Sequence, residues 1–190
     1  MPARYAIYYA PDPDSPFAHR AAAWLGRDAA TGVRVPQFVP PGYAAADFAS
    51  LTADARRYGF HATLKAPFAL AEGARREALV EAVAELAQGQ AAFSSQIWVH
   101  ALGSFIAIRL VSRSEPMQAL HEASVREIDR FRAPPAPAEL ARRRKAPLSP
   151  MQDQNLQAWG YPYVFADFRF HMTLTGRVQN ADERLRLLDA

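Results

Sequence analysis

One short pattern occurs twice in this sequence, and both copies contain a histidine. Residues 60–64 read Phe-His-Ala-Thr-Leu, and residues 170–174 read Phe-His-Met-Thr-Leu. The chain has five histidines in all, so a second one with the same three neighbours is a chance event of roughly one in several hundred. Imidazole titrates near neutral pH, where it can either take up or give up a proton. The repeat therefore predicts paired acid and base chemistry by His61 and His171.

Hydrolysis of a cyclic phosphodiester is a reaction that needs two such groups. One proton leaves the attacking water and another joins the departing ribose oxygen, on opposite sides of the phosphorus atom. Thr63 and Thr173 follow the histidines by two residues. On a strand they share the face of the preceding histidine, about 6.6 Å along the chain. Their hydroxyls are expected to hold the non-bridging oxygens. The scheme requires no metal and no cofactor.

Three further side chains are candidate substrate contacts. Lys65 extends the first row and Arg177 the second, while Tyr5 is placed to line the mouth of the site. Each has an ordinary alternative, because cations at strand ends are commonly solvated and aromatic residues commonly belong to the core. A metal site is disfavoured, since each motif supplies one histidine and no carboxylate follows at ligand spacing.

The composition narrows the class of protein. The 190 residues, half of them apolar, suffice for a single globular unit with one substantial core. The absence of cysteine excludes disulfides, thiolate catalysis and cysteine-bound zinc. A net charge of +3 gives a mild preference for anionic ligands. No signal-peptide pattern and no apolar run of about 20 residues occurs, so a cytoplasmic protein without a membrane partner is expected.

Hydrophobic periodicity and turn residues predict the elements that carry the motifs. Strands are expected at residues 5–9, 59–70, 97–102, 105–111, 163–165 and 168–178, with Gly103-Ser104 as a type II′ turn. Helices are expected at residues 16–25, 74–88, 116–131 and 150–159. Residues 27–52 read as a long connection with room for a short helical turn, and residues 132–150 as an exposed proline-rich segment. Within that segment, the basic run 142–145 is a solvated loop, a lid that closes on an anionic substrate, or a contact for a phosphate backbone. This order indicates an α+β fold.

The remaining histidines, His19, His100 and His121, lie outside any repeated pattern. A single histidine on an apolar element is usually a satisfied structural residue. Structural roles are therefore expected for all three.

Paired His-x-[Ser/Thr]-aliphatic motifs on strands resemble those of the two-histidine (2H) phosphoesterase superfamily, which includes LigT-like 2′-5′ RNA ligases and cyclic phosphodiesterases. More narrowly, residues 4–9, 58–65 and 170–177 resemble a branch associated with phosphonate metabolism and carbon–phosphorus lyase genes. The resemblance implies one domain over residues 1–190, with two pseudo-symmetric lobes of antiparallel sheet flanked by helices around a central cleft. It also implies catalytic roles for His61, Thr63, His171 and Thr173.

Three functions are compatible with these motifs. The first is metal-independent hydrolysis of a small cyclic phosphate or 2′-phosphodiester, with a cyclic ribose phosphate from phosphonate catabolism as the substrate. The second is a cyclic phosphodiesterase or 2′-5′ RNA ligase acting on RNA ends. The third is a non-catalytic module that binds RNA or a nucleotide. The motifs lie 110 positions apart, which is wider than expected of the small RNA ligases and favours the first function.

Overall fold

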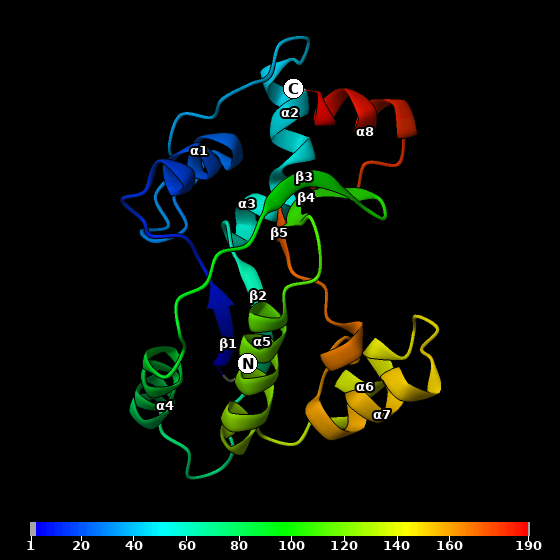
Figure 1. Ribbon diagram of the computed structural model, residues 1–190. Coiled ribbons are helices and arrows are strands. Elements are labelled where there is room, and N and C mark those ends of the chain that lie inside the picture. The colour runs from blue at the N-terminus through cyan, green and yellow to red at the C-terminus, as the bar shows by residue number, and fades with distance from the viewer. Residues whose placement is uncertain (1–2, 190) are drawn as a thin grey trace. The chain divides into compact units, whose positions relative to one another are not determined.

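The computed structural model describes residues 3–189, which form an α+β fold with five strands and eight α-helices (Figure 1). The strands are β1 (Arg4–Tyr9), β2 (Ala62–Ala69), β3 (Ile97–Leu102), β4 (Phe105–Leu110) and β5 (His171–Thr173). They are hydrogen-bonded in the order β1-β2-β5-β4-β3, and the pairs β2–β5, β4–β5 and β3–β4 are antiparallel. The predicted fold class, an antiparallel sheet flanked by helices, is confirmed.

The helices lie between the strands along the chain. They are α1 (Pro16–Leu25), α2 (Ala45–Leu51), α3 (Ala53–Tyr58), α4 (Arg76–Gln88), α5 (Glu115–Ile128), α6 (Pro137–Arg143), α7 (Pro150–Trp159) and α8 (Ala181–Leu188), with 3₁₀ turns η1 (Asp129–Phe131) and η2 (Phe165–Asp167). None of these helices is both long and apolar enough to cross a lipid bilayer.

The chain forms two compact units that interleave along the sequence. Unit 1 contains the described residues up to Tyr8, then Thr63–Ser95 and Arg113–Phe170. Unit 2 contains Tyr9–Ala62, Gln96–Ser112 and the described residues from His171 onward. One boundary therefore falls inside β2, directly after Ala62. As a result, His61, His171 and Thr173 all belong to unit 2, whereas Thr63 belongs to unit 1.

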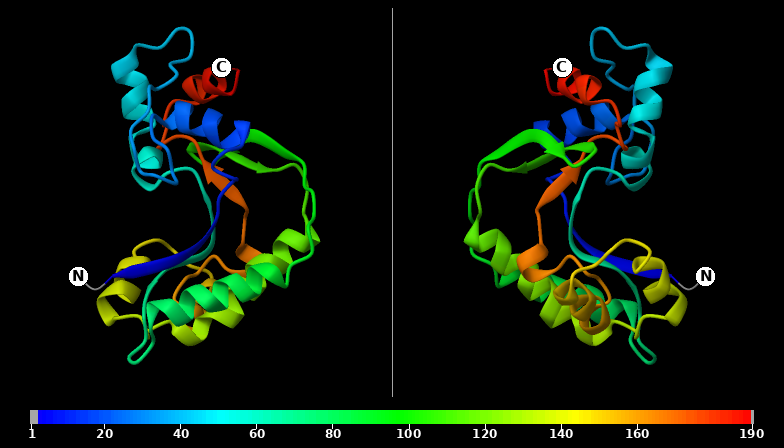
Figure 2. Two further views of the ribbon diagram at one scale, coloured as in Figure 1. Left: turned by 90° about the vertical axis from the view of Figure 1, so that its left-hand side faces the viewer. Right: turned by 90° about the vertical axis from the view of Figure 1, so that its right-hand side faces the viewer.

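Unit 2 is built on the hairpin of β3 and β4, which is joined as predicted. Gly103 has a φ of 62°, while the following Ser104 has no positive φ, which suits a type II′ turn. β5 lies beside β4. Helices α1, α2 and α8 lie on the same side of these three strands (Figure 2). On that side, Ile106 and Met172 are at most 1% exposed and form the core.

Unit 1 packs α4 against α5 through their apolar faces. Leu79, Ala82 and Leu86 on α4, like Met117, Val125 and Ile128 on α5, are buried and recur at helical spacing. The start of α5 is set by a local hydrogen bond. The hydroxyl of Ser114 accepts a hydrogen bond from the Met117 N–H and caps the start of α5.

Several predicted elements are wrong or shorter than expected. The short helical turn expected within residues 27–52 is the seven-residue helix α2, whose Phe48 is fully buried. The proline-rich segment contains α6, which begins at a proline. Residues 163–165 are not a strand, since Phe165 has a φ of 57° and starts η2. The helix α8 was not expected at all.

The last predicted strand, residues 168–178, is reduced to the three residues of β5. The cause is local. The N–H groups of Leu174 and Thr175 both donate to the single carbonyl of Ile106, at 2.9 and 3.3 Å. A regular ladder uses a different carbonyl for each donor, so the strand ends here. The short β5 nevertheless places His171 and Thr173 between two neighbouring strands.

Candidate active site

His61 is positioned by the turn between α3 and β2. Gly59 ends α3 with a φ of 77°, and a Cβ atom there would lie 3.0 Å from the Cβ of Ala29. The Nδ1 atom of His61 lies 3.0 Å from the Gly59 carbonyl oxygen. A carbonyl only accepts, so Nδ1 carries the hydrogen in the neutral ring and Nε2 carries the lone pair. The imidazole is therefore oriented with its basic nitrogen away from the turn.

The two histidine motifs meet through their central residues. Ala62 pairs with Met172 across the antiparallel strands β2 and β5. Both residues are 1% exposed and lie in the core, so their neighbours point to the opposite face. Extending this register by one residue places His61 opposite Thr173, with His171 diagonal to it at about 7–8 Å between Cα atoms. That spacing leaves room for a phosphoryl group between two rings.

The electrostatics of His61 agree with this placement. Burial lowers the pKa of His61 below its ordinary value of 6.5, and the nearby His171 lowers it further. The hydrogen bond to Gly59 opposes these effects by favouring the charged ring. The net result favours a neutral His61 at neutral pH. The influence of His171 on this pKa agrees with the strand register, which places the two histidines on one face.

The two motifs also share one pattern of burial. Residues 61–68 and 171–178 are in turn half-buried, buried, half-buried, buried, buried, half-buried, exposed and buried. This correspondence holds at all eight positions although only three residue types are shared between the two segments. The sequence repeat is therefore a structural repeat, with each histidine and each threonine in an equivalent, partly accessible position.

The fifth position of each repeat serves as an internal anchor. Lys65 is 4% exposed, and its Nζ donates to the Val125 carbonyl at 2.9 Å and to Asp129 Oδ1 at 2.8 Å. Thr175 is 1% exposed, and its hydroxyl oxygen accepts from the Ile106 N–H at 2.9 Å. The partly accessible row that begins at each histidine ends here, because the residues at the fourth and fifth positions of each repeat are both buried. We therefore leave Lys65 out of the proposed site.

The other predicted contacts lie in different places. Arg177 is exposed in unit 2, and Tyr5 is half-buried on β1 in unit 1. Thr63 is half-buried at the start of the unit 1 part of β2. The roles of these three residues in substrate binding or catalysis stay predictions.

His121 has the structural role expected of it. It is 2% exposed, its Nδ1 lies 2.9 Å from the Leu64 carbonyl oxygen, and its Nε2 accepts from the Phe165 N–H at 3.0 Å. The ring also stacks on Phe168 at 3.7 Å between centroids. Burial lowers its pKa to about 4, so the ring is neutral at neutral pH. His19, by contrast, is exposed on α1.

Arg109, the one charged residue in the apolar run of residues 105–111, lies directly opposite His171 in the pairing of β4 with β5. Its Nη1 donates to the Ala101 carbonyl at 3.2 Å, which carries the guanidinium over β3 and away from β5. We therefore leave Arg109 out of the proposed site. The ring of Phe105, on the same strand, lies 5.9 Å from that of His171.

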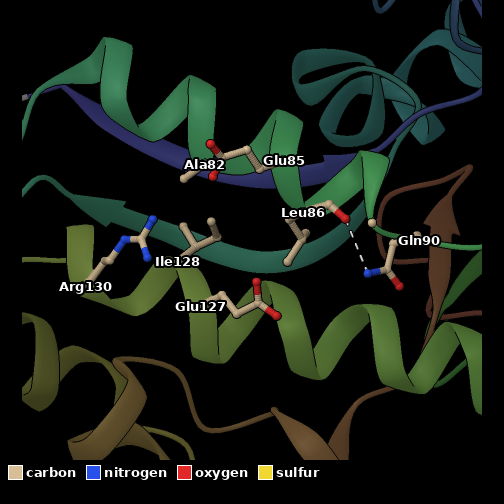
Figure 3. A pocket seen from close by; sticks show the side chains of 8 residues that line it. Ala82, Glu85, Leu86, Gln90, Glu127, Ile128 and Arg130 are labelled. Atoms are coloured by element: carbon tan, nitrogen blue, oxygen red, sulfur yellow. Dashed lines mark hydrogen bonds between the residues drawn. The ribbon is translucent and has the colours of Figure 1, made fainter.

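A pocket elsewhere in the molecule does not contain these residues. It opens between α4 and α5 of unit 1, where acidic side chains from both helices border it (Figure 3). Its lining residues are Ala82, Glu85, Leu86, Gly89, Gln90, Glu127, Ile128 and Arg130. Within residues 3–189, no three or more His, Cys, Asp or Glu side chains are grouped so that they could hold a metal ion.

Comparison with known proteins places the chain in a family. Residues 63–190 match the family described as "Protein of unknown function (DUF1045)". The chain belongs to this family. The DUF1045 match contains the second histidine motif and begins two residues after His61.

Curated relatives are considerably longer than this chain. It is 44% identical over 180 residues to the protein named ribose 1,5-bisphosphate phosphokinase PhnN of Janthinobacterium sp. (strain Marseille), covering 94% of this chain and 40% of that protein. It is 41% identical over 179 residues to the protein of the same name from Laribacter hongkongensis (strain HLHK9), covering 94% and 41%. The chain thus spans about two fifths of the relatives it matches. No solved structure matches it.

Proposed function

We propose that this chain is a phosphoesterase of the two-histidine type that hydrolyses a small cyclic phosphate or 2′-phosphodiester. The observation that carries the proposal is the pairing of Ala62 with Met172. It supports a site in which His61 and His171 share one face of adjacent strands within one compact unit. Two imidazoles at that separation suit a reaction that moves two protons on opposite sides of one phosphorus atom.

The environment of His61 supports its role as the base, and the mechanism then gives the role of acid to His171. Its lowered pKa keeps His61 neutral, so it acts as the general base, with Nε2 as the accepting nitrogen. His61 takes a proton from water while the water oxygen bonds to phosphorus. His171, in its charged form, gives a proton to the ribose oxygen as the phosphorus–oxygen bond of the ring breaks. The products are a phosphate monoester and a free hydroxyl, and the two rings then exchange protons with solvent.

Charge that builds on the phosphoryl oxygens in the transition state needs hydrogen-bond donors. Thr173 lies on the same face as His171, and its hydroxyl supplies one such donor. In the proposed mechanism Thr63 supplies the equivalent donor from the first motif. The mechanism uses no metal and no cofactor.

The relatives support a metabolic setting for this reaction. Their name refers to ribose 1,5-bisphosphate, which is a sugar carrying two phosphates. Together with the resemblance to phosphonate-metabolism proteins, this supports a role in phosphonate catabolism. The substrate proposed is a cyclic ribose phosphate, the five-membered ring that remains after a carbon–phosphorus bond is broken.

The relatives' name also gives a second candidate, a phosphokinase. Against it, the sequence lacks the G-x-x-x-x-G-K-[S/T] pattern that binds nucleotide phosphates in P-loop kinases. The relatives are more than twice as long as this chain, so kinase activity in them has ample sequence outside the matched part.

A substrate panel separates these candidates. The purified chain would be incubated in excess EDTA with a cyclic ribose phosphate, with 2′,3′-cyclic nucleotides and with an oligonucleotide that ends in a cyclic phosphate. A parallel reaction would contain ribose 1,5-bisphosphate and ATP with magnesium. We expect ring opening of the small cyclic phosphates and no ATP consumption. Faster turnover of the oligonucleotide would favour an RNA-end enzyme, ATP consumption a kinase, and binding without turnover a non-catalytic module.

A further inference from the structure

The basic run of residues 142–145 contains arginines in two different situations. Arg144 makes two hydrogen bonds to the carboxylate of Asp153, at 2.7 and 3.0 Å. Arg143 is more buried, with 22% of its side chain exposed, yet its Nε atom has no hydrogen-bond partner in the described part of the chain. Its Nη2 lies 4.0 Å from Glu139 Oε1, which is too long for a hydrogen bond. A mostly buried guanidinium with unused donors calls for a ligand or another acceptor.

The same carboxylate oxygen is shared by three guanidinium groups of unit 1. Arg142 and Arg143 end α6, and Arg4 begins β1 (Figure 1). Nη2 of Arg4 donates to Glu139 Oε1 at 2.7 Å, while Nη2 of Arg142 lies 3.6 Å from it. Burial lowers the pKa of Arg143, and the charges of Arg142 and Arg4 lower it further. Three cations around one carboxylate leave two positive charges in excess, so an anion would be attracted to this cluster.

The ring of Tyr161 holds the guanidinium of Arg143 by stacking. The Cζ atom of Arg143 lies 4.7 Å from the centroid of this ring, within the range of a cation–π interaction. Tyr161 is itself packed edge-on against Tyr163, with 5.6 Å between the centroids. Stacking fixes the plane of a guanidinium but uses none of its N–H donors. Arg143 is therefore oriented in advance for a planar, bidentate contact with an anion.

Stabilisation of α6 is the ordinary explanation for such a cluster. Arg142 and Arg143 follow Glu139 by three and four residues, a spacing at which opposite charges attract on a helix. A helix pair of this kind is normally solvated and does not require the burial of Arg143. It also leaves unexplained why Arg4, from a distant strand, makes the short hydrogen bond to the same carboxylate. The cluster therefore has more positive charge than the stability of α6 requires.

We propose that Arg4, Arg142 and Arg143 form a binding site in unit 1 for the phosphate monoester group of a small ligand. Such a group ionises a second time near pH 6 and carries close to two negative charges at neutral pH. Its charge thus matches the excess of two, whereas each phosphate of a nucleic-acid backbone carries one charge. His61 and His171 belong to unit 2, so this inference goes beyond the proposed function and does not depend on it.

Two variants test the site through the binding of inorganic phosphate, measured by calorimetry near neutral pH. Arg143→Met keeps an unbranched side chain against Tyr161 and removes the charge. Phosphate should bind this variant about tenfold to a hundredfold more weakly, the range for losing hydrogen bonds to a charged group. Arg142→Gln, at a position 61% exposed, should also bind phosphate more weakly. Arg113→Gln is the matched control, because Arg113 is 73% exposed and paired with Glu115, and it should bind as the wild type does.

Thermal unfolding separates ligand binding from a structural role of Arg143. Replacing a poorly satisfied buried charge by an apolar side chain is commonly neutral or stabilising. Arg143→Met should therefore melt at or above the wild-type temperature without phosphate, and phosphate should raise the melting temperature of the wild type alone. If Arg143→Met melts lower, the exposed Arg142→Gln variant decides. Normal phosphate affinity in Arg142→Gln, or in Arg143→Met, would overturn the inference, as would a wild-type chain that binds no phosphate.

Two further titrations identify the site and the kind of phosphate. Phosphate binding that depends on Arg143 should be kept in His171→Ala. Loss of binding in His171→Ala, with normal binding in Arg143→Met, would overturn the inference and assign the anion to the candidate active site. An RNA hexanucleotide without a terminal phosphate offers only diester groups. It should bind more weakly than inorganic phosphate at physiological salt, and tighter binding that requires Arg142 and Arg143 would replace the monoester by a nucleic-acid backbone.

Discussion

Ala62 and Met172 face each other across two antiparallel strands, and each is the middle residue of a His-x-Thr segment. This one pair fixes which residues of the two motifs share a face, because side chains alternate along each strand. Since both central residues are buried, the flanking histidines point to the accessible side. Segments that are 110 residues apart in the chain are thereby joined into one candidate site.

The pH dependence of the reaction should reveal the base. His61 must be neutral to accept a proton, and burial together with His171 lowers its pKa below 6.5. The acid limb of kcat/KM against pH should therefore have its midpoint below pH 6.5. The profile of kcat/KM against pH, in buffers of constant ionic strength, measures this. An acid limb with its midpoint above pH 6.5 would assign the base to another group.

Chelators should leave the activity intact. Acid–base work by two imidazoles, with threonine donors on the phosphoryl oxygens, requires no Lewis acid. The rate in excess EDTA should equal the rate of the same preparation without chelator. Loss of activity with EDTA, followed by recovery with zinc or manganese, would rule out this mechanism.

Thr173, in the second motif, and Thr175, directly after this motif, should behave differently when changed to valine. Thr173→Val removes a hydroxyl from the face of His171, and we expect kcat to fall about tenfold to a hundredfold with little change in stability. Thr175→Val leaves the buried Ile106 N–H without its acceptor. That change should cost about 1–3 kcal/mol of unfolding free energy and leave kcat nearly unchanged. Chemical denaturation and steady-state kinetics of both variants measure this, and the reverse pattern would exchange the two roles.

His121 should make stability depend on pH between 6.5 and 4. The unfolded chain protonates this ring near 6.5, while the folded chain holds it neutral down to about 4. Unfolded molecules bind the extra proton in this window, so the contribution is complete above pH 6.5 and lost as pH falls toward 4. Its size is about 3 kcal/mol for a pKa lowered from 6.5 to about 4.

Urea denaturation at several pH values tests this for wild type, His121→Asn and His19→Asn. The His121→Asn chain should be less stable at pH 7.5, and its stability should change less steeply below pH 6.5, by about one proton. The His19→Asn chain, altered at an exposed position of α1, should follow the wild type. Identical slopes in all three chains would show that His121 does not cause the pH dependence.

Local signals in the sequence predicted the parts of the fold that are determined locally. Ser15 and Gly26 bracket α1 as expected, and Ser149 and Gly160 bracket α7. Caps and glycine turns act within a few residues, so their effect is visible in the sequence. A short helical turn was expected in the region of α2, but the sequence did not place it, because the burial of its Phe48 depends on distant packing.

In the candidate site, too, the features set by local sequence were predicted and those that depend on distant contacts were not. The repeated motif identified His61 and His171, and strand alternation correctly predicted that Ala62 and Met172 face away from the histidines. The prediction that Lys65 extends the accessible row was not met, because its side chain is buried in unit 1 by bonds to Val125 and Asp129, which are distant in the sequence. Phe105 was missed because its contact with the His171 ring depends on the register between β4 and β5, which no local pattern encodes.

The central claim is that His61 and His171 work as one acid–base pair, and hydrolysis of a cyclic phosphate by their variants tests it most directly. Product formation would be followed by ³¹P NMR in EDTA for wild type, His61→Ala, His171→Ala, the double variant and the control His19→Ala. Each single variant should lose about 10²- to 10⁴-fold in kcat, and the double variant hardly more than either, because the two groups act as a unit. Near-wild-type rates in either single variant would contradict the account.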